Sequence, residues 1–250
     1  MMIKKFSLLL LFVFPLLAVA QINQKDANGK KHGQWIGNHE NSTQKAYEGT
    51  FDHGKRTGLF YFYYPNGKLK AAMLFSKNGT YAKAEMYFED GTLIGKGNYV
   101  NEKKDSVWTY YGGTGYVRKT ETWKNGKLDG KTTIYFEPQP GDTKMRVLQY
   151  FTYKDSVLNG EFAEYYLNGK RKLLGNYLDG NMDGKVIEFY EDSGRKMVVK
   201  NYKYAVRHGL WEYFEENGTL IKRRYFDKNR ELEGEVLKLK LAEIDGKSGN

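Results

Sequence analysis

The segment Gly209–Phe226, GLWEYFEENGTLIKRRYF, decides the fold of this 250-residue chain. It predicts one β-hairpin, in which an aromatic strand runs into a turn at residues 216–218 and a second strand ends in aromatic residues. An earlier segment, Gly58–Phe75 (GLFYFYYPNGKLKAAMLF), repeats this pattern almost position for position. The chain is therefore built from copies of one hairpin.

The copies align on the small residue before each aromatic strand, which we call position zero. Successive zero positions are 24 or 25 residues apart, except for one interval of 30 residues. They are Gly33, Gly58, Ala82, Ser106, Gly130, Gly160, Gly184, Gly209 and Gly234. Eight intervals of such regular length predict a repeat array.

Aromatic residues recur at two places in the unit. Five positions after zero stand Tyr63, Tyr87, Tyr111, Tyr135, Tyr165, Phe189 and Phe214. The second strand closes with Phe51, Phe75, Tyr99, Trp123, Tyr177, Tyr202 and Phe226. Equivalent rings line up when equivalent strands lie side by side, so these columns predict packing between neighbouring hairpins.

Turn residues and small residues complete the unit. Asn-Gly or Asp-Gly pairs, which accept the positive φ of tight hairpin turns, stand at 66–67, 90–91, 168–169 and 217–218, and again at 78–79, 125–126 and 179–180. Ala71, Gly95, Gly97 and Gly175 lie opposite aromatics and predict rings packed over bare backbone. The predicted fold is all-β: an elongated array of antiparallel hairpins in one twisted sheet, with eight repeats of about 24 residues.

The two ends differ from the array. Residues 1–20 combine Lys4 and Lys5, an apolar run and Ala18-Val19-Ala20, which predicts a cleaved secretory signal peptide. Residues 21–31 are predicted to be a loose polar leader, 32–244 the repeat domain and 245–250 a disordered tail. Within the domain, the inserted residues Glu137–Lys144 predict a longer loop, and the alternating leucines of Glu235–Leu241 predict a terminal strand.

Composition limits the chemistry of the predicted mature chain. It contains no cysteine, which excludes disulfides and thiolate metal sites. Cleavage after Ala20 leaves 38 Lys and Arg against 30 Asp and Glu, a net charge of +8. Such a charge favours anionic partners, although mixed surface charges that solvate a thin sheet explain many of the lysines equally well. Nucleic acid fits the charge but conflicts with export, and no later segment is apolar enough to span a membrane.

The pattern G-x-W-x-Y-[YF]-x-x-N-G-x-L, followed by an aromatic and a turn glycine, resembles the bacterial variant of the MORN repeat. Arrays of this kind are often named YwqK-type antitoxins, and the resemblance extends over residues 31–234. It implies an elongated antiparallel sheet that binds phospholipid or a protein partner. The antitoxin name implies neutralisation of a toxin by surface contact, which after export requires an exported toxin.

The sequence carries no catalytic signature. It lacks the His-Glu-x-x-His and Gly-x-Ser-x-Gly motifs, and no pair of acidic residues stands out by its spacing. His32 and His208 both precede a zero position, so the repeat accounts for them before metal binding does. We therefore expect no enzyme, no cofactor and no metal site.

Two functions remain open for an exported array. The first is a protein-interaction scaffold of the bacterial envelope, with an immunity-like role. The second is a module that binds envelope glycan or anionic lipid through its aromatic columns and basic surface. The candidate surface residues for either function are Trp35, Phe60, Trp108, Trp123, Trp211, Tyr63, Tyr111 and Tyr165. Because these rings also fit the packing between hairpins, the packing interpretation is the stronger one.

Overall fold

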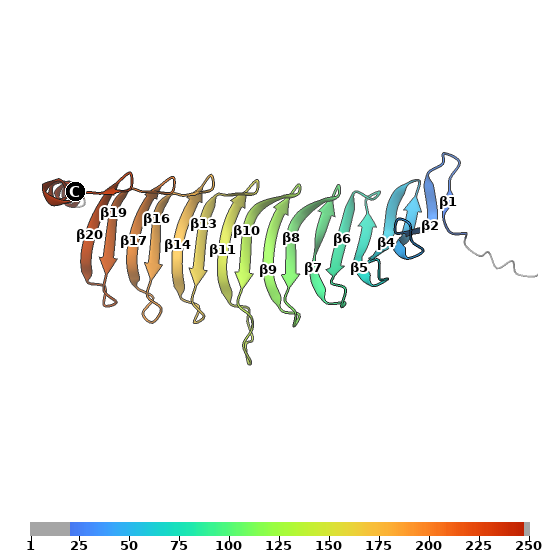
Figure 1. The fold of residues 1–250 in the computed structure, drawn as a ribbon, viewed down its shortest axis with the longest axis horizontal. Coiled ribbons are helices and arrows are strands. Elements are labelled where there is room, and N and C mark those ends of the chain that lie inside the picture. Colours follow the sequence, from blue (N-terminus) through green and yellow to red (C-terminus); the bar gives the residue numbers. More distant parts are fainter. Residues whose placement is uncertain (1–20, 248–250) are drawn as a thin grey trace, which may run out of the picture.

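The computed structural model describes residues 21–247, which form a single open antiparallel sheet (Figure 1). The predicted signal peptide, residues 1–20, lies outside the described residues. The long strands are β2 (Lys31–Asn38), β3 (Lys45–Asp52), β4 (Lys55–Tyr63), β5 (Leu69–Ser76), β6 (Tyr81–Tyr87), β7 (Leu93–Val100), β8 (Lys103–Tyr111), β9 (Val117–Lys124), β10 (Lys127–Tyr135), β11 (Val147–Lys154), β13 (Gly160–Tyr165), β14 (Arg171–Leu178), β16 (Gly184–Phe189), β17 (Lys196–Lys203), β19 (Gly209–Phe214) and β20 (Leu220–Asp227). Five two-residue strands accompany them: β1 (Gln24–Lys25), β12 (Val157–Leu158), β15 (Asn181–Met182), β18 (Val206–Arg207) and β21 (Arg230–Glu231).

Each long strand pairs with the strands that precede and follow it in the chain, so the hairpins form one row (Figure 1). The predicted hairpin array is thus confirmed, including eight units within the described residues. The insertion in unit five is confirmed as well. It extends the turn between β10 and β11 beyond the other turns, and Arg146 and Asp142 form an ion pair at 2.6 Å within it (Figure 1).

The turns at the two edges of the sheet differ in type. At one edge both central residues have positive φ, as in Asn125 (52°) and Gly126 (80°), which is the backbone of a type I′ turn. At the other edge only the glycine is positive, as in Gly67 (81°), and the strand register shifts between Phe62 and Tyr63. That combination is a type I turn followed by a bulge, and it recurs in the units with the same sequence pattern.

The strand register explains why position zero is small. Each closing aromatic lies directly across from the zero residue of its own unit, as Phe75 does from Gly58 and Phe226 from Gly209. Unit five, for which the sequence suggested no closing aromatic, follows the same rule, because Tyr153 pairs with Gly130. The insertion had hidden this member of the column.

The largest part of the core is a layer of rings on one face of the sheet, which we call the aromatic face. Phe60 is fully buried there, and its ring centroid lies 5.1 Å from that of Phe51 and 5.2 Å from that of Phe75. Both contacts are edge-to-face, and the one between Phe51 and Phe60 links unit one to unit two. The buried rings of this face are Phe51, Phe60, Phe75, Trp108, Phe162, Trp211 and Phe226.

The N-terminal leader is not loose, as the sequence had suggested. β1 pairs with β2, and the side chain of Asn23 accepts a hydrogen bond from the backbone N–H of Ile36 at 2.8 Å. The backbone N–H of Asn23 also donates to the carbonyl of Gln34 at 2.8 Å. The leader therefore satisfies backbone groups that the first long strand would otherwise expose at the end of the sheet.

The C-terminal prediction of a strand is wrong. Residues Gly234–Lys247 form the helix α1, which lies beyond β20 at the end of the row (Figure 1). Leu237, Leu241 and Ile244 are its half-buried apolar residues, at the i, i+4, i+7 spacing of a helix face, whereas Leu239 is 66% exposed. Leucine, lysine, glutamate and alanine favour helix, and that preference outweighed the two-residue alternation of the leucines.

The predicted disordered tail also begins inside this helix. The Asp245 carboxylate accepts two hydrogen bonds from the guanidinium of Arg223 on β20, at 2.6 and 2.7 Å. This bidentate pair ties the helix to the last hairpin. Residues 248–250 of the predicted tail lie outside the described residues.

Replacing Gly97 by alanine should destabilise the array, because a Cβ there would lie 2.3 Å from the ring of the fully buried Trp108. We expect a loss of about 1–3 kcal/mol in the free energy of unfolding, measured by urea denaturation. Gly113 is the matched control, since nothing lies within 4 Å of the equivalent Cβ. Equal effects of Gly97→Ala and Gly113→Ala would contradict the close ring–backbone packing.

Candidate functional site

Basic side chains lie over parts of the aromatic face, on which residues 21–247 place no second layer of secondary structure. In four units the residue two positions before zero is basic, and its charge lies over the closing ring of the same unit. These residues are Lys31, Arg56, Lys104 and Arg207. The distances to the ring centroids are 5.0, 5.4, 4.8 and 4.6 Å in that order. Their aliphatic stems shield the rings from water while the charges remain at the surface.

Lys104 shows how closely this packing is fitted. Its Nζ lies 4.5 Å from the ring centroid of Trp108 and donates a hydrogen bond to the Tyr110 hydroxyl at 2.7 Å. Burial lowers the pKa of Lys104 and raises that of Tyr110. These groups are engaged with one another, which makes the cluster a packing network.

The carboxylate of Glu121 completes that network. It accepts a hydrogen bond from the Trp123 indole at 3.0 Å and pairs with Lys119 at 2.6 Å. Burial acts to raise the pKa of Glu121, but the hydrogen bonds from Lys119 and Tyr110 outweigh it and hold the pKa below its ordinary value. The buried charge is therefore compensated within the fold.

The eight predicted surface aromatics do not form one exposed surface. Phe60 and Trp108 are fully buried and Trp211 is 7% exposed, so these three rings belong to the packing of the aromatic face. Trp35 and Trp123 on the same face are half-buried, and both indole N–H groups are engaged, with the carbonyl of Gln24 and with Glu121 respectively.

The other three predicted residues, Tyr63, Tyr111 and Tyr165, are half-buried and lie on the opposite face, which we call the open face. The Tyr63 hydroxyl donates to the Glu48 carboxylate, and the Lys96 ammonium lies 5.6 Å from the Tyr111 ring centroid. The Tyr165 ring lies 6.4 Å from that of Tyr150. All three therefore contact charged or aromatic neighbours and remain partly accessible.

A groove on the open face was not predicted from the sequence. It has a volume of about 430 Å³ and crosses strands β4 to β8. Its apolar lining includes Leu59, Leu74 and Val107, which are 53%, 46% and 53% exposed. Leu59 and Val107 follow position zero directly, and Leu74 lies across from Leu59. Strand alternation could have placed all three opposite the buried rings.

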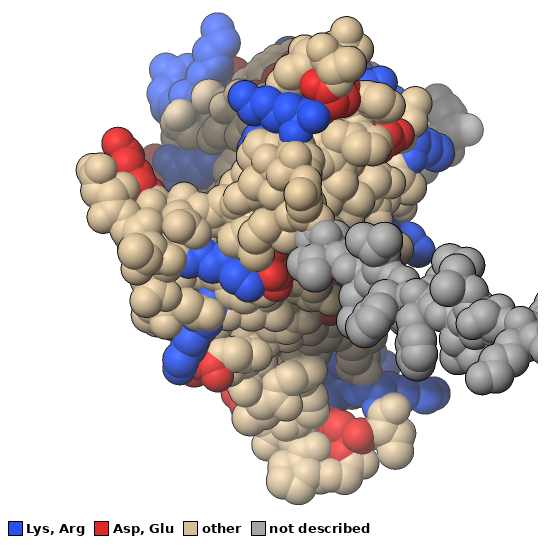
Figure 2. All heavy atoms as spheres, turned by 90° about the vertical axis from the view of Figure 1, so that its right-hand side faces the viewer, with Lys and Arg blue, Asp and Glu red and all other residues tan. Residues whose placement is uncertain are grey.

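Charges of both signs border this groove. Lys83, Glu85 and Lys96 line it, and Glu85 accepts a hydrogen bond from the Tyr87 hydroxyl at 2.7 Å. That bond, together with burial, raises the pKa of Tyr87 to about 12. The end of the molecule seen in Figure 2 likewise mixes basic and acidic side chains. The surface can thus match a partner that carries both signs of charge.

Hydrogen bonds from one further position of the repeat, which was not singled out from the sequence, join the turns of neighbouring units. Six positions after zero, the hydroxyls of Tyr64, Tyr166 and Tyr190 donate to the carbonyl of the residue at position five of the next unit, at 2.8–2.9 Å. His39 occupies this position in unit one, and its Nε2 donates to the Tyr63 carbonyl at 3.1 Å. This histidine is therefore structural.

Among residues 21–247, one group of histidine and carboxylate side chains has the spacing of metal ligands. It comprises His32, Asp52 and His53 at the N-terminal end of the sheet, and its ligand atoms lie within 4.8 Å of one another. Of the helices in the described part of the chain, none is both long and apolar enough to cross a bilayer.

The hairpin unit itself is shared with a known family. Four of the eight units match the MORN repeat variant. The matched residues are 56–77, 81–101, 158–179 and 207–228, which lie in units two, three, six and eight. No curated protein matches the chain. Repeats of this kind indicate a non-catalytic binding or scaffold protein.

Ionisation of Tyr63 offers a test of its site. Burial and the hydrogen bond to Glu48 favour the neutral phenol and raise the pKa of Tyr63 to about 12. Because this pKa is higher in the folded protein, its contribution to stability is present below pH 10 and is lost as the pH rises from 10 to 12. A difference titration at 295 nm between the wild type and Tyr63→Phe should show a step near pH 12. A step near pH 10 would contradict the contact.

Proposed function

We propose that this protein is an exported, non-catalytic scaffold of the bacterial envelope that binds a protein partner along the open face. The observation that carries the proposal is the groove of exposed leucine and valine side chains between charges of both signs. Apolar residues that a monomer leaves exposed within a concave surface are typical of a binding site. An immunity-type role, in which the bound partner is an exported toxin, is the form that the resemblance to antitoxin-named arrays suggests.

The side chains of the two faces differ in how far they are engaged within the fold, and this difference supports the assignment. Rings and basic side chains on the aromatic face contact each other, whereas the leucine and valine side chains of the groove on the open face are about half exposed. Glycan or anionic-lipid binding by the aromatic columns is less well supported, since Phe60, Trp108 and Trp211 are buried. The cations over Trp108 and Trp211, Lys104 and Lys200, are likewise engaged in cation–π contacts.

Capture experiments with envelope extract should detect a protein that binds the wild type and loses binding to Leu59→Asp or Val107→Asp. A buried aspartate left without a partner weakens an interface by several kcal/mol, so affinity should fall about 100-fold or more. Ile221→Asp is the matched control, because Ile221 is 60% exposed and lies at the far end of the sheet.

Three outcomes would count against the proposal. They are equal loss of the partner in the Ile221 control, retention of the partner by both groove variants, and absence of any captured protein. Sedimentation with peptidoglycan or acidic vesicles that persists in the groove variants would favour the glycan or lipid function instead. Its sensitivity to salt would separate charge from ring stacking.

Export rests on residues 1–20 and has its own test. Expression in a bacterium with a secretory pathway should yield a chain whose intact mass begins at Gln21, recovered outside the cytoplasm. The short apolar run and the Ala-x-Ala site are the features that a signal peptidase recognises. An intact chain in the cytoplasm would contradict export and leave the binding proposal to be judged by the capture experiment alone.

A further inference from the structure

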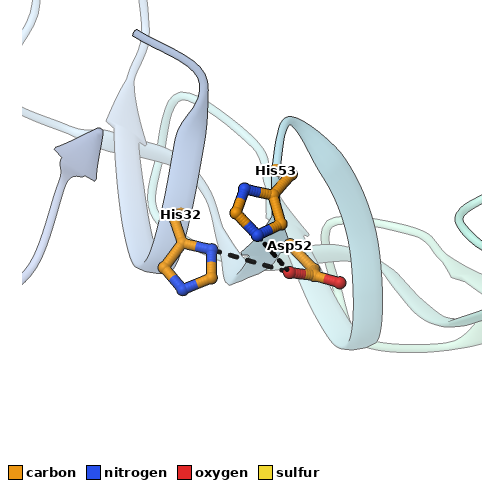
Figure 3. A group of neighbouring side chains, drawn as sticks. All are labelled: His32, Asp52 and His53. Atoms are coloured by element: carbon orange, nitrogen blue, oxygen red, sulfur yellow. Dashed lines mark ion pairs between the residues drawn. The ribbon is translucent and has the colours of Figure 1, made fainter. Parts of the chain in front are cut away.

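Three exposed side chains converge where the first unit turns into the second (Figure 3). His32 lies on β2, Asp52 ends β3 and His53 occupies the turn before β4. The Asp52 Oδ1 atom is 3.6 Å from His32 Nδ1 and 3.7 Å from His53 Nε2. The two imidazole rings are 4.8 Å apart between centroids, so all three potential ligand atoms face one small volume.

A fourth residue orients His53 from behind. This residue is Asp26, whose carboxylate accepts a hydrogen bond from His53 Nδ1 at 2.6 Å. The bond leaves His53 Nε2 as the unprotonated nitrogen of the neutral ring. Asp26 is itself held by the backbone N–H groups of Asn28 and Lys30, at 2.8 and 2.9 Å, and its side chain is only 9% exposed. A histidine fixed by a carboxylate in this way is the usual outer support of a metal ligand.

From this geometry we infer a site for a divalent transition metal, best suited to Zn²⁺, ligated by His32 Nδ1, Asp52 Oδ1 and His53 Nε2. Two imidazoles and one carboxylate are ligands that zinc accepts, with a fourth position left for water or a partner group. Bond lengths of about 2.0–2.2 Å and tetrahedral angles require ligand atoms roughly 3.3 Å apart. The two measured separations to Asp52 are close to this value, and exposed side chains can rotate to close the remainder.

The ligands come from segments that a bound ion would join. His32 lies on β2, beside the turn that joins the leader to β2, whereas Asp52 and His53 lie at the end of β3 and in the turn that follows it. A metal at this point would link β2 to the turn after β3, and the hydrogen bond from His53 to Asp26 would tie the leader to the same site and stabilise the N-terminal end of the sheet. This inference is independent of the binding proposed for the open face.

The last unit provides a natural comparison. His208 and Asp227 occupy the positions equivalent to His32 and Asp52, and the His208 Nδ1 atom is also 3.6 Å from its carboxylate. The residue after Asp227 is Lys228, where the first unit has His53. Two ligands remain there, and we expect no comparable affinity for zinc at that end.

Isothermal titration of the purified, untagged protein with Zn²⁺ should show one tight site per chain. His32→Ala and His53→Asn should each weaken binding on the order of 100-fold or more, and Asp26→Asn by about 10–100-fold. Asparagine is chosen at position 53 because it tolerates the positive φ of 45°. His208→Ala is the matched control and should bind as the wild type does.

Circular dichroism of each variant will establish that the sheet is intact. Ca²⁺ at the same concentration should not compete, since it prefers a shell of oxygen ligands. The inference is overturned if the folded wild type binds no zinc, or if His208→Ala loses as much affinity as His32→Ala. Full affinity in His53→Asn would also overturn it.

Discussion

The structure depends on the exclusion of water from the aromatic rings of a single sheet, on which residues 21–247 place no second layer of strands or helices. Rings pack edge to face within and between hairpins, and in four of the eight units a basic side chain two positions before the zero residue lies across them. The excess of lysine and arginine is thus partly a structural component, because their stems take the place of a covering layer. A glycine such as Gly97 beneath Trp108 lets the ring lie directly on the backbone.

This arrangement makes every unit dependent on its neighbours and leaves the two ends in need of closure. The leader satisfies backbone groups of β2, and the helix α1 is tied to β20 through Arg223 and Asp245. Exposed sheet edges promote association between chains, so both ends protect the array. The fully buried rings Phe60, Trp108 and Phe226 lie on the aromatic face, and the open face presents the groove around Leu59, Leu74 and Val107.

The repeat and the hairpins followed from the sequence because glycine turns and aromatic columns recur at a fixed spacing. The burial of individual rings did not, since Trp108 and Trp123 belong to the same unit yet differ in how their neighbours cover them. The C-terminal helix was missed because Leu237 and Leu241, four residues apart, satisfy both the strand and the helix period. The groove and the histidine cluster join residues from different strands, and no local pattern brings His32 next to His53.

The number of hairpins in the row sets the distance between the two ends of the molecule. Neighbouring strands lie about 4.8 Å apart, so each unit adds roughly 10 Å between the leader at one end and the helix at the other (Figure 1). Since a unit contacts only its neighbours, gain or loss of one repeat would change this distance without disturbing the rest. The protein can therefore serve as a spacer that holds whatever its two ends contact at a separation set by the number of hairpins.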